Sequence, residues 1–261
     1  IPGIKPRTLN EKELFIKKNE VVSFIFKKKI INNGKYKTIR LSKPLPKINK
    51  VVKHFSLYDG RYEFKILSFK KNQIVGKSLS TFILLPGKGL NIPLSIYDEI
   101  LQNKMYLDFL SKCKKIDFNA IGISYIQSSK VINKIRARFP KQKIVSKIEN
   151  LEGVNNLEEI ISSTDIVMID RGDLCAEIGY NNLFATINKI AATASEYKKP
   201  LIMATENLDN MILNLNPTKS EIISLEYSKL IGTSFIMLSE ETATSSNWFN
   251  TIRWLENFIK K

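Results

Sequence analysis

The sequence predicts an α/β protein with a small all-β region at its N-terminus. From about residue 95 the chain alternates short apolar runs with amphipathic stretches, which is typical of parallel βα units. Residues 1–90 instead hold short β-branched and aromatic runs separated by turn signals. The character of the sequence changes at Pro86-Gly87. We therefore expect two domains, an all-β domain over 1–90 and a βα domain over 91–261.

The charge of the chain follows the same division. There are 41 Lys and Arg against 25 Asp and Glu, a net charge of +16 at pH 7. Residues 1–90 hold the whole surplus, while the acidic and basic side chains of the remaining residues balance. A strongly basic region favours an anionic partner. At 43% hydrophobic and 25% charged residues, the composition excludes wholesale disorder.

Two further classes of protein are excluded. No apolar run approaches the roughly 18–20 residues of a membrane span, so we expect no membrane partner. The chain has 2 cysteines, too few for a disulfide framework, and this favours a reducing, intracellular setting.

Alternating apolar and polar residues predict the strands of the all-β region. Asn32-Asn33-Gly34 is a tight-turn signal between two of them, and Asp59-Gly60 is another. The predicted strands are Val21–Lys29, Tyr36–Leu41, Val51–Tyr58, Arg61–Phe69 and Gln73–Gly76.

Five apolar runs predict the strands of the βα region: Phe118–Ile126, Ile144–Ile148, Ile166–Ile169, Leu201–Thr205 and Phe235–Leu238. Predicted helices cover about 95–113, 130–139, a stretch ending near 163, 184–197, 217–230 and 248–260. Ser95 with Asp98 reads as a capping box, Pro217 as a first helical residue and Gly232 as a helix end.

Five strands do not complete an eight-stranded barrel. A closed barrel typically needs about 250 residues, and the βα region is much shorter. The pattern alone therefore leaves two architectures open, an open parallel sheet covered on both faces or a part of a barrel.

Side chains that suit phosphate and metal chemistry follow four consecutive predicted strands. Lys147 and Glu149 project from the same side of one strand because strand side chains have a period of two. Asp170 to Asp173 follow the next strand, and their Gly172 lets a ligand approach the backbone. Thr205 and Ser239 follow the last two strands.

The carboxyl ends of parallel strands meet at one mouth of the fold. The residues alone therefore predict a magnesium-dependent enzyme that acts on a phosphorylated substrate.

In order and spacing, these motifs resemble the pyruvate kinases. The similarity covers essentially the whole chain and is strongest from about 120 to 245. It rests on residues 146–150 with Gly153-Val154, on Arg171 to Leu174, on Ala204-Thr205 with Met211, on Pro217 to Glu221, and on Ile236 to Ser239 followed by Glu241-Thr242. Gly3 to Thr8, Asp59-Gly60 and Leu85 to Gly87 resemble landmarks of the family's lid domain.

The resemblance implies a partial (β/α)8 TIM barrel over 91–261 with a small all-β lid over 1–90. It implies transfer of the phosphoryl group from phosphoenolpyruvate to ADP, giving pyruvate and ATP in the last step of glycolysis. Lys147 would stabilise the phosphoryl group and the enolate. Thr205 would lie beside the enolpyruvate, and Ser239 would help to relay the proton.

The ligand-binding residues are implied by the same resemblance. Glu149 and Asp173 would hold Mg²⁺ or Mn²⁺. The substrate would be bound by Lys147 and Thr205 together with Gly172 and Asp173, whose backbone would receive its carboxylate. Arg7 would contact the nucleotide from the lid.

Other expectations concern the rest of the protein. The chain lacks the first three barrel strands and the C-terminal domain of the family, so the ligands of the family's K⁺ lie outside it and its own site is expected to be incomplete. The family implies a homo-oligomer, a tetramer in most members. We expect a cytoplasmic protein, with a plastid or mitochondrion as the alternative compartment.

The sequence departs from the family pattern around the predicted site. Asp170 replaces a small residue, Cys175 a glycine, Glu206 a glutamine, Lys219 an arginine and Glu240 a glycine. Three of these changes add carboxyl groups near one mouth, where they would repel a phosphate unless they point away. One alternative is therefore a catalytically reduced or dead paralogue that serves as a subunit.

The other alternative is a basic β-domain that binds nucleic acid. Aromatic side chains such as Phe55, Tyr58 and Tyr62 would then stack against bases. We favour the enzyme, with no nucleic acid partner, because the strand-end residues form an ordered set.

Overall fold

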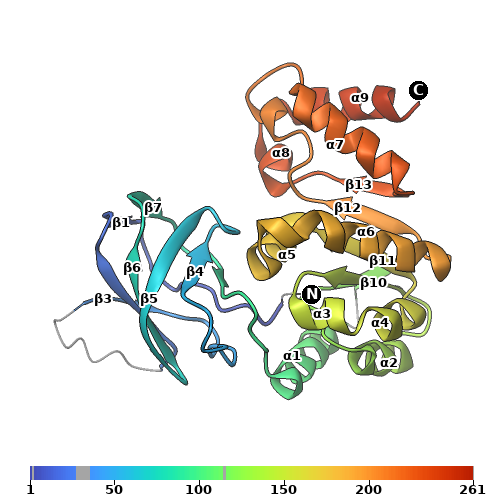
Figure 1. Cartoon of the computed structure of the whole chain (residues 1–261). Coiled ribbons are helices and arrows are strands. Elements are labelled where there is room, and N and C mark those ends of the chain that lie inside the picture. Colours follow the sequence, from blue (N-terminus) through green and yellow to red (C-terminus); the bar gives the residue numbers. More distant parts are fainter. Residues whose placement is uncertain (2, 28–35, 114–115, 261) are drawn as a thin grey trace.

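The computed structural model describes residues 1, 3–27, 36–113 and 116–260 (Figure 1). The predicted turn at 32–34 lies outside the described residues. The lid strands are β1 (Leu14–Ile16), β2 (Val21–Ile25), β3 (Lys37–Arg40), β4 (His54–Leu57), β5 (Tyr62–Lys70), β6 (Gln73–Ser78), β7 (Phe82–Leu84) and β8 (Leu90–Asn91).

The βα part follows in one direction along the chain. Its elements are α1 (Glu99–Lys112), β9 (Ala120–Ile123), α2 (Ser129–Arg138), β10 (Lys143–Ile148), α3 (Leu151–Asn155), α4 (Leu157–Ser163), β11 (Ile166–Asp170), α5 (Arg171–Ile178), α6 (Tyr180–Glu196), β12 (Leu201–Ala204), a 3₁₀ turn (Asp209–Ile212), α7 (Lys219–Leu230), β13 (Phe235–Met237), α8 (Glu240–Thr244) and α9 (Trp248–Ile259).

Within the described residues the lid consists of a sheet in the order β3-β2-β6-β5-β4-β8 and a separate β1-β7 pair. Phenylalanine rings fill its core. Phe55 and Phe64 lie opposite each other on β4 and β5 and stack with ring centroids 5.0 Å apart, while Phe24 meets both edge-on at 5.4 Å. Offset and edge-on pairs of this kind add about 0.5–1.5 kcal/mol each beyond the area they bury.

The burial of the lid aromatics counts against the nucleic-acid alternative. Phe55 is 1% exposed, so it is a core residue and offers no face to a base. Tyr62 stacks on Phe82 with centroids 4.2 Å apart, which occupies one face of that ring. Two of the three proposed stacking platforms therefore serve the packing of the lid.

The order of the parallel strands settles the architecture that the sequence left open. The sheet runs β13-β12-β11-β10-β9, every pair is parallel, and neighbours in sequence are neighbours in space. A doubly wound sheet reverses its strand order at a switch point, and the described strands show no reversal. The arrangement is that of a partial (β/α)8 barrel, as the resemblance implied.

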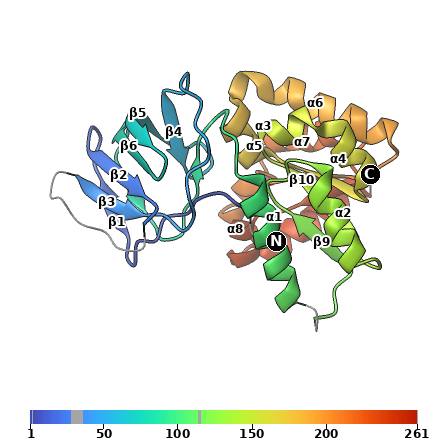
Figure 2. The same cartoon turned by 90° about the horizontal axis from the view of Figure 1, so that it is seen from below.

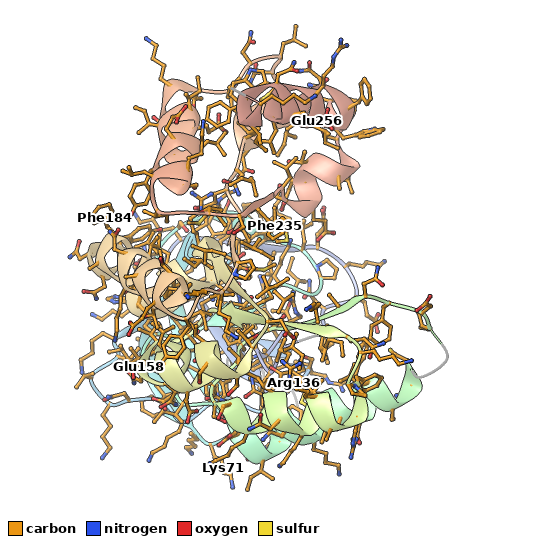
Figure 3. The ribbon with its side chains drawn as sticks, turned by 90° about the vertical axis from the view of Figure 1, so that its right-hand side faces the viewer. Lys71, Arg136, Glu158, Phe184, Phe235 and Glu256 are labelled. Atoms are coloured by element: carbon orange, nitrogen blue, oxygen red, sulfur yellow. The ribbon has the colours of Figure 1, made fainter. Side chains whose placement is uncertain are left out.

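Successive βα units lie one beyond the next in chain order (Figure 1), and the lid strands lie to one side of them (Figure 2). In Figure 3, Arg136 on α2 and Glu158 on α4 lie low in the molecule, Phe184 on α6 and Phe235 on β13 lie above them, and Glu256 on α9 lies near the top.

The two faces of this sheet have different partners. On β10, Ile144 and Ile148 belong to the large apolar core shared with the helices. Val145 belongs instead to a small cluster on the opposite face with Met168 and Ala204. Since side chains alternate along a strand, residues 147 and 149 share the face of Val145, and Asp170 shares the face of Met168. The acidic and basic residues at the strand ends therefore point to the inner side of the partial barrel.

Two helix starts differ from the predictions because a better cap lies nearby. Asp98 caps α1 by accepting a hydrogen bond from the Leu101 N–H, so Ser95 lies outside the helix. Thr218 caps α7 and forms a reciprocal capping box with Glu221, which leaves Pro217 before the helix.

Helix α5 was not predicted, and it contains Arg171, Gly172 and Asp173 in its first turn. It spans 8 residues, and no side chain caps its N-terminus. A helix this short, with a glycine in its first turn, gives too few turns for a periodic signal. In the described parts of the chain, no helix combines the length and the apolar character that crossing a membrane requires.

Gly76→Ala should destabilise the lid. A Cβ at this position would lie 2.5 Å from Phe55 Cε1 and 3.0 Å from Phe64 Cβ, and the stacked rings cannot move aside without strain. We expect a loss of about 1–3 kcal/mol in the free energy of unfolding, as for overpacked cores, measured by urea denaturation.

The matched control is Gly122→Ala, in the middle of β9, where a Cβ would meet nothing within 4 Å. Its stability should be unchanged or slightly raised. Equal losses for the two variants would contradict this account of the lid core.

Candidate active site

Lys147 is held between two carboxylates on the inner face of the sheet. Its Nζ lies 2.5 Å from Glu149 Oε1 and 3.0 Å from Asp170 Oδ2. Glu149 is 1% exposed and also accepts a hydrogen bond from the Tyr125 N–H. The period-two prediction that Lys147 and Glu149 share a side is borne out by this contact, and Asp170 joins them from the adjacent strand.

Asp173 lies beside this group, in the first turn of α5, and is tied to the lid. Its Oδ1 accepts hydrogen bonds from Lys5 Nζ, from Asn91 Nδ2 at 3.0 Å and from the Tyr125 hydroxyl at 3.0 Å. All the hydrogen bonds described for this carboxylate end on Oδ1. Its other oxygen, Oδ2, therefore remains for a further ligand.

Lys5 joins the lid to the mouth. Its Nζ pairs with Asp173 and, at 2.8 Å, with Asp59 at the tip of a lid turn. A Cβ on Gly172 would lie 3.6 Å from Asp59 Cβ, so this turn sits directly against α5. Lys5 is 5% exposed. The lid thus approaches the strand-end residues through one buried ammonium group.

Thr205 begins a strained loop after β12. Thr205, Glu206 and Leu208 have φ angles of +64°, +52° and +61°, in a region that residues other than glycine rarely adopt. Arg171 holds the loop, since its guanidinium donates to the Thr205 carbonyl and, at 2.7 Å, to Asn207 Oδ1.

The hydroxyl of Thr205 faces the α5 N-terminus. Its Oγ1 accepts from the Gly172 N–H at 3.1 Å and donates to the Ala204 carbonyl at 2.7 Å, with Asp170 Oδ1 a longer 3.3 Å away. The fold therefore links Glu149, Lys147, Asp170, Thr205 and Gly172 through successive contacts, and Asp173 lies within 4.8 Å of the other two carboxylates.

Ser239 and Arg7 lie apart from these contacts. The hydrogen bonds described for the Ser239 hydroxyl involve Asp209 and Thr242, and it caps α8. Arg7 is exposed in the lid, and its Nη1 donates to the Gly87 carbonyl at 3.0 Å. In the described structure neither contacts the Lys147 group.

Burial and neighbouring charge shift the pKa values of the central groups. Burial alone would lower the pKa of Lys147, but Glu149 and Asp170 outweigh it and raise that pKa above its usual range. Burial raises the pKa of Glu149, and the charges of Asp170 and Asp173 add to the rise. Burial would also raise the pKa of Asp173, but Lys5 reverses this, and the pKa of Asp173 falls to about 2.

Three carboxylates at this mouth suit a divalent cation. One oxygen each from Glu149, Asp170 and Asp173 lies within 4.8 Å of the other two. Mg²⁺ and Mn²⁺ prefer carboxylate oxygens, and a cation between these groups would offset both the burial and the repulsion that raise the pKa of Glu149. The donor set therefore fits the expected metal.

Sequence reasoning missed Lys5, Asn91, Tyr125 and the clamp role of Arg171. Lys5 and Asp173 are 168 residues apart in the chain, and no local pattern marks such a pair. Arg171 lies in a motif that its neighbouring glycine and aspartate made conspicuous. The burial of the Arg171 side chain against the loop after β12, however, depends on the packing of α5, which the local sequence does not show.

A second buried carboxyl lies behind Asp173. Glu177 on α5 is fully buried, its Oε1 accepts from the Tyr97 hydroxyl at 3.2 Å, and its Oε2 has no hydrogen-bond partner in the described structure. Burial raises the pKa of Glu177 to about 8. Tyr97 belongs to the segment that returns from the lid. So does Leu94, whose backbone N–H donates to the Glu177 carbonyl.

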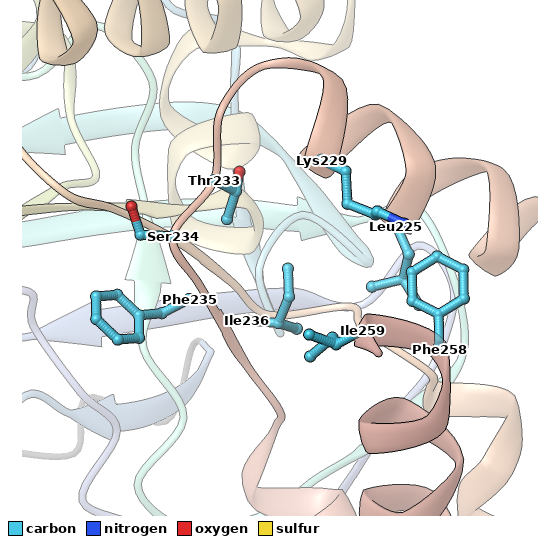
Figure 4. A pocket seen from close by; sticks show the side chains of 8 residues that line it. All are labelled: Leu225, Lys229, Thr233, Ser234, Phe235, Ile236, Phe258 and Ile259. Atoms are coloured by element: carbon cyan, nitrogen blue, oxygen red, sulfur yellow. The ribbon is translucent and has the colours of Figure 1, made fainter. Parts of the chain in front are cut away.

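A hollow of about 290 Å³ lies elsewhere, between α7, β13 and α9 (Figure 4). It opens at the start of β13, whereas the residues above lie at the carboxyl ends of the strands. Lys229, its only titratable lining residue among those described, lies over the Phe258 ring at 4.9 Å. This hollow therefore offers no group for the chemistry of the site.

Comparison with known proteins identifies the family. The family model for the pyruvate kinase barrel domain matches residues 2–252. Pyruvate kinase from Buchnera aphidicola subsp. Schizaphis graminum is 32% identical over 253 residues, covering 93% of this chain and 52% of that protein. Pyruvate kinase 2 from Saccharomyces cerevisiae is 30% identical over 259 residues, covering 94% and 50%.

Solved structures of pyruvate kinases share the fold of this chain. A pyruvate kinase from Pyrobaculum aerophilum shares the fold with a TM-score of 0.79 at 23% identity, over 99% of this chain and 58% of that one. The pyruvate kinase of Cryptosporidium parvum has a TM-score of 0.79 at 27% identity, over 96% and 54%. The chain belongs to the pyruvate kinase family, and it spans about half the length of the curated relatives it matches.

The buried Glu177 should make stability fall as pH rises. Because its folded pKa of about 8 exceeds the unfolded value of about 4.3, its contribution is fully present below about pH 4.3 and is lost by about pH 8. Glu177→Gln removes this titration. We expect its stability relative to wild type to grow by up to roughly 1.4 kcal/mol per pH unit between pH 5 and 8.

Urea denaturation at pH 5.5, 7 and 8.5 would measure this difference. Glu196→Gln, an exposed position on α6, is the control and should show a constant difference from wild type. A constant difference for Glu177→Gln as well would show that Glu177 does not titrate in this range.

Proposed function

We propose that this member of the pyruvate kinase family transfers a phosphoryl group from phosphoenolpyruvate to ADP, with Mg²⁺ or Mn²⁺ as cofactor. The observation that carries the proposal is the convergence of Lys147, Glu149 and Asp173 at one mouth of the partial barrel, beside a lid whose Lys5 contacts Asp173. Since the chain spans about half of its relatives, the proposal concerns the whole protein of which these residues would form the central part.

Lys147 would neutralise developing charge. Phosphoryl transfer depends mainly on positioning and on electrostatic stabilisation of the transferred group and the leaving oxygen. The Lys147 ammonium is mostly buried, fully charged and fixed at the carboxyl end of β10. A fixed charge in a partly dry site needs no reorganisation when the enolate forms, so it stabilises the transition state more than a solvated lysine would.

Glu149 and Asp173 would hold the metal. Glu149 is positioned by Lys147 and the Tyr125 N–H, and Asp173 by Lys5, Asn91 and Tyr125, so both carboxylates are fixed before a cation arrives. The bound metal would supply charge neutralisation for the phosphoryl and enolate oxygens.

Thr205 and Gly172 would orient the substrate. The Thr205 hydroxyl and the Gly172 N–H now bind each other, and both become available to a substrate carboxylate that displaces this contact. The start of α5 adds the positive end of a helix dipole, which favours an anion there.

The lid would complete the site over the nucleotide. Arg7 uses only Nη1 in the hydrogen bonds described for its side chain, which leaves further donors for a phosphate. Ser239 remains the proposed proton relay, a role that would need a water or a loop movement to link it to the enolate. We retain as predictions that the whole protein requires K⁺, that it forms a homo-oligomer and that it is cytoplasmic.

Lys147→Met should remove turnover in the intact protein. Groups that stabilise charge in the transition state are usually worth about 10²–10³ in rate, and we expect a loss of at least that size in a coupled lactate dehydrogenase assay.

Lys143→Met is the matched control, because Lys143 is exposed at the start of the same strand; its activity should be unchanged. Retention of turnover within about tenfold by Lys147→Met would contradict the assigned role. Wild-type protein that binds metal yet shows no turnover would favour the dead-paralogue alternative.

Glu149→Gln should weaken Mn²⁺ binding. Replacing a charged ligand by a neutral amide removes most of its attraction for a divalent cation, and we expect at least a tenfold rise in the Mn²⁺ dissociation constant, measured by electron paramagnetic resonance. Glu158→Gln on α4, which is exposed, should leave it unchanged. Equal affinities for both variants would place the metal elsewhere.

A further inference from the structure

We propose that Asp170 is a positioning residue that pairs with the Lys147 ammonium as an internal counter-ion, so that an anionic substrate reaches Lys147 only when Asp170 has been drawn away from it. The inference rests on the proposed function and adds to it a residue that controls access to Lys147. It concerns a residue to which the family resemblance gives no role.

Asp170 engages the ammonium group that would receive the substrate. Its Oδ2 lies 3.0 Å from Lys147 Nζ. Its Oδ1 lies 3.3 Å from the Thr205 hydroxyl, whose shorter hydrogen bond, at 2.7 Å, goes to the Ala204 carbonyl. A carboxylate in this position makes the same kind of charge-assisted contact that a substrate oxygen would make.

The orientation of Asp170 is not required by the helix that follows it. Asp170 is the N-cap residue of α5, where an aspartate normally accepts a hydrogen bond from a backbone N–H of the first turn. Its side chain forms no such cap bond. The side chain turns instead to the inner face of the sheet, where its Oδ2 pairs with Lys147.

The charges around the mouth link the metal to this contact. Glu149, Asp170 and Asp173 bring three carboxyl groups within 4.8 Å of one another, while Lys147 and Lys5 bring two positive charges. With a divalent cation bound among the carboxyl groups, Asp170 has a stronger partner than Lys147. Its release removes one of the two carboxylates that hold the ammonium and opens that side to a phosphoryl oxygen, so binding of the metal and of the anion is positively coupled.

The test is a ³¹P NMR titration of the intact protein with phosphoenolpyruvate, with and without Mg²⁺. In the wild type we expect weak binding without Mg²⁺ and a large gain with it. Asp170→Asn should tighten the metal-free binding by about tenfold or more, as expected for a hydrogen bond to a charged group, and should reduce the gain from Mg²⁺.

Asp165→Asn is the matched control. Asp165 precedes the same strand at its other end and pairs with Arg136 at 3.0 Å, so its removal should leave both affinities unchanged. Asp170→Ala provides a second variant that cannot accept a hydrogen bond from Lys147, and circular dichroism verifies that each protein is folded.

Two results separate failure of this inference from failure of the proposed function. If Asp170→Asn and Asp170→Ala bind phosphoenolpyruvate without metal no more tightly than the wild type does, the counter-ion role alone is overturned. If Lys147→Met bound phosphoenolpyruvate in Mg²⁺ as tightly as the wild type, Lys147 would not bind the substrate, and the proposed function would fail with it.

Discussion

The buried ion pairs at the mouth of the partial barrel are the constraint on which the rest of the site depends. Glu149 and Asp170 are nearly inaccessible to water, and a buried carboxylate is costly unless a cation accompanies it. Lys147 satisfies both from within the sheet, and Lys5 satisfies Asp173 from the lid. The positions of these side chains are therefore set by mutual neutralisation before any ligand is present.

This constraint couples the two parts of the chain. Lys5 lies in the segment that enters the lid, Asn91 in its last strand, and both donate to the same oxygen of Asp173. Asp59 at the lid turn shares the Lys5 ammonium. The carboxylate proposed to hold the metal is therefore also the one that ties the lid to the mouth, and a cation at its Oδ2 would lie beside the contacts that hold the lid.

Much of the fold could be predicted because it is encoded locally. Apolar runs such as Ile144–Ile148 and Ile166–Ile169 identify strands, and alternation alone places Lys147 and Glu149 on one side. Strand order could not be predicted from pattern, because two architectures share the same alternation of strands and helices. The family resemblance identified the correct one, and the strand order confirms it.

The surroundings of the site were harder to predict because they depend on contacts between distant residues. Lys5 meets Asp173 only because the lid folds back over α5, and Arg171 clamps the Thr205 loop only because α5 forms a short helix that carries no periodic signal. Phe55 belonged only to the disfavoured nucleic-acid alternative, and its burial in the lid core removes it as a stacking surface.

A crystal structure of the intact protein soaked with Mn²⁺ would test the central claim most directly. We expect an anomalous peak within coordination distance of Glu149 and Asp173, beside Lys147. The account would be contradicted by crystals saturated with Mn²⁺ in which the anomalous peak lies elsewhere and Lys147 still lies between Glu149 and Asp170.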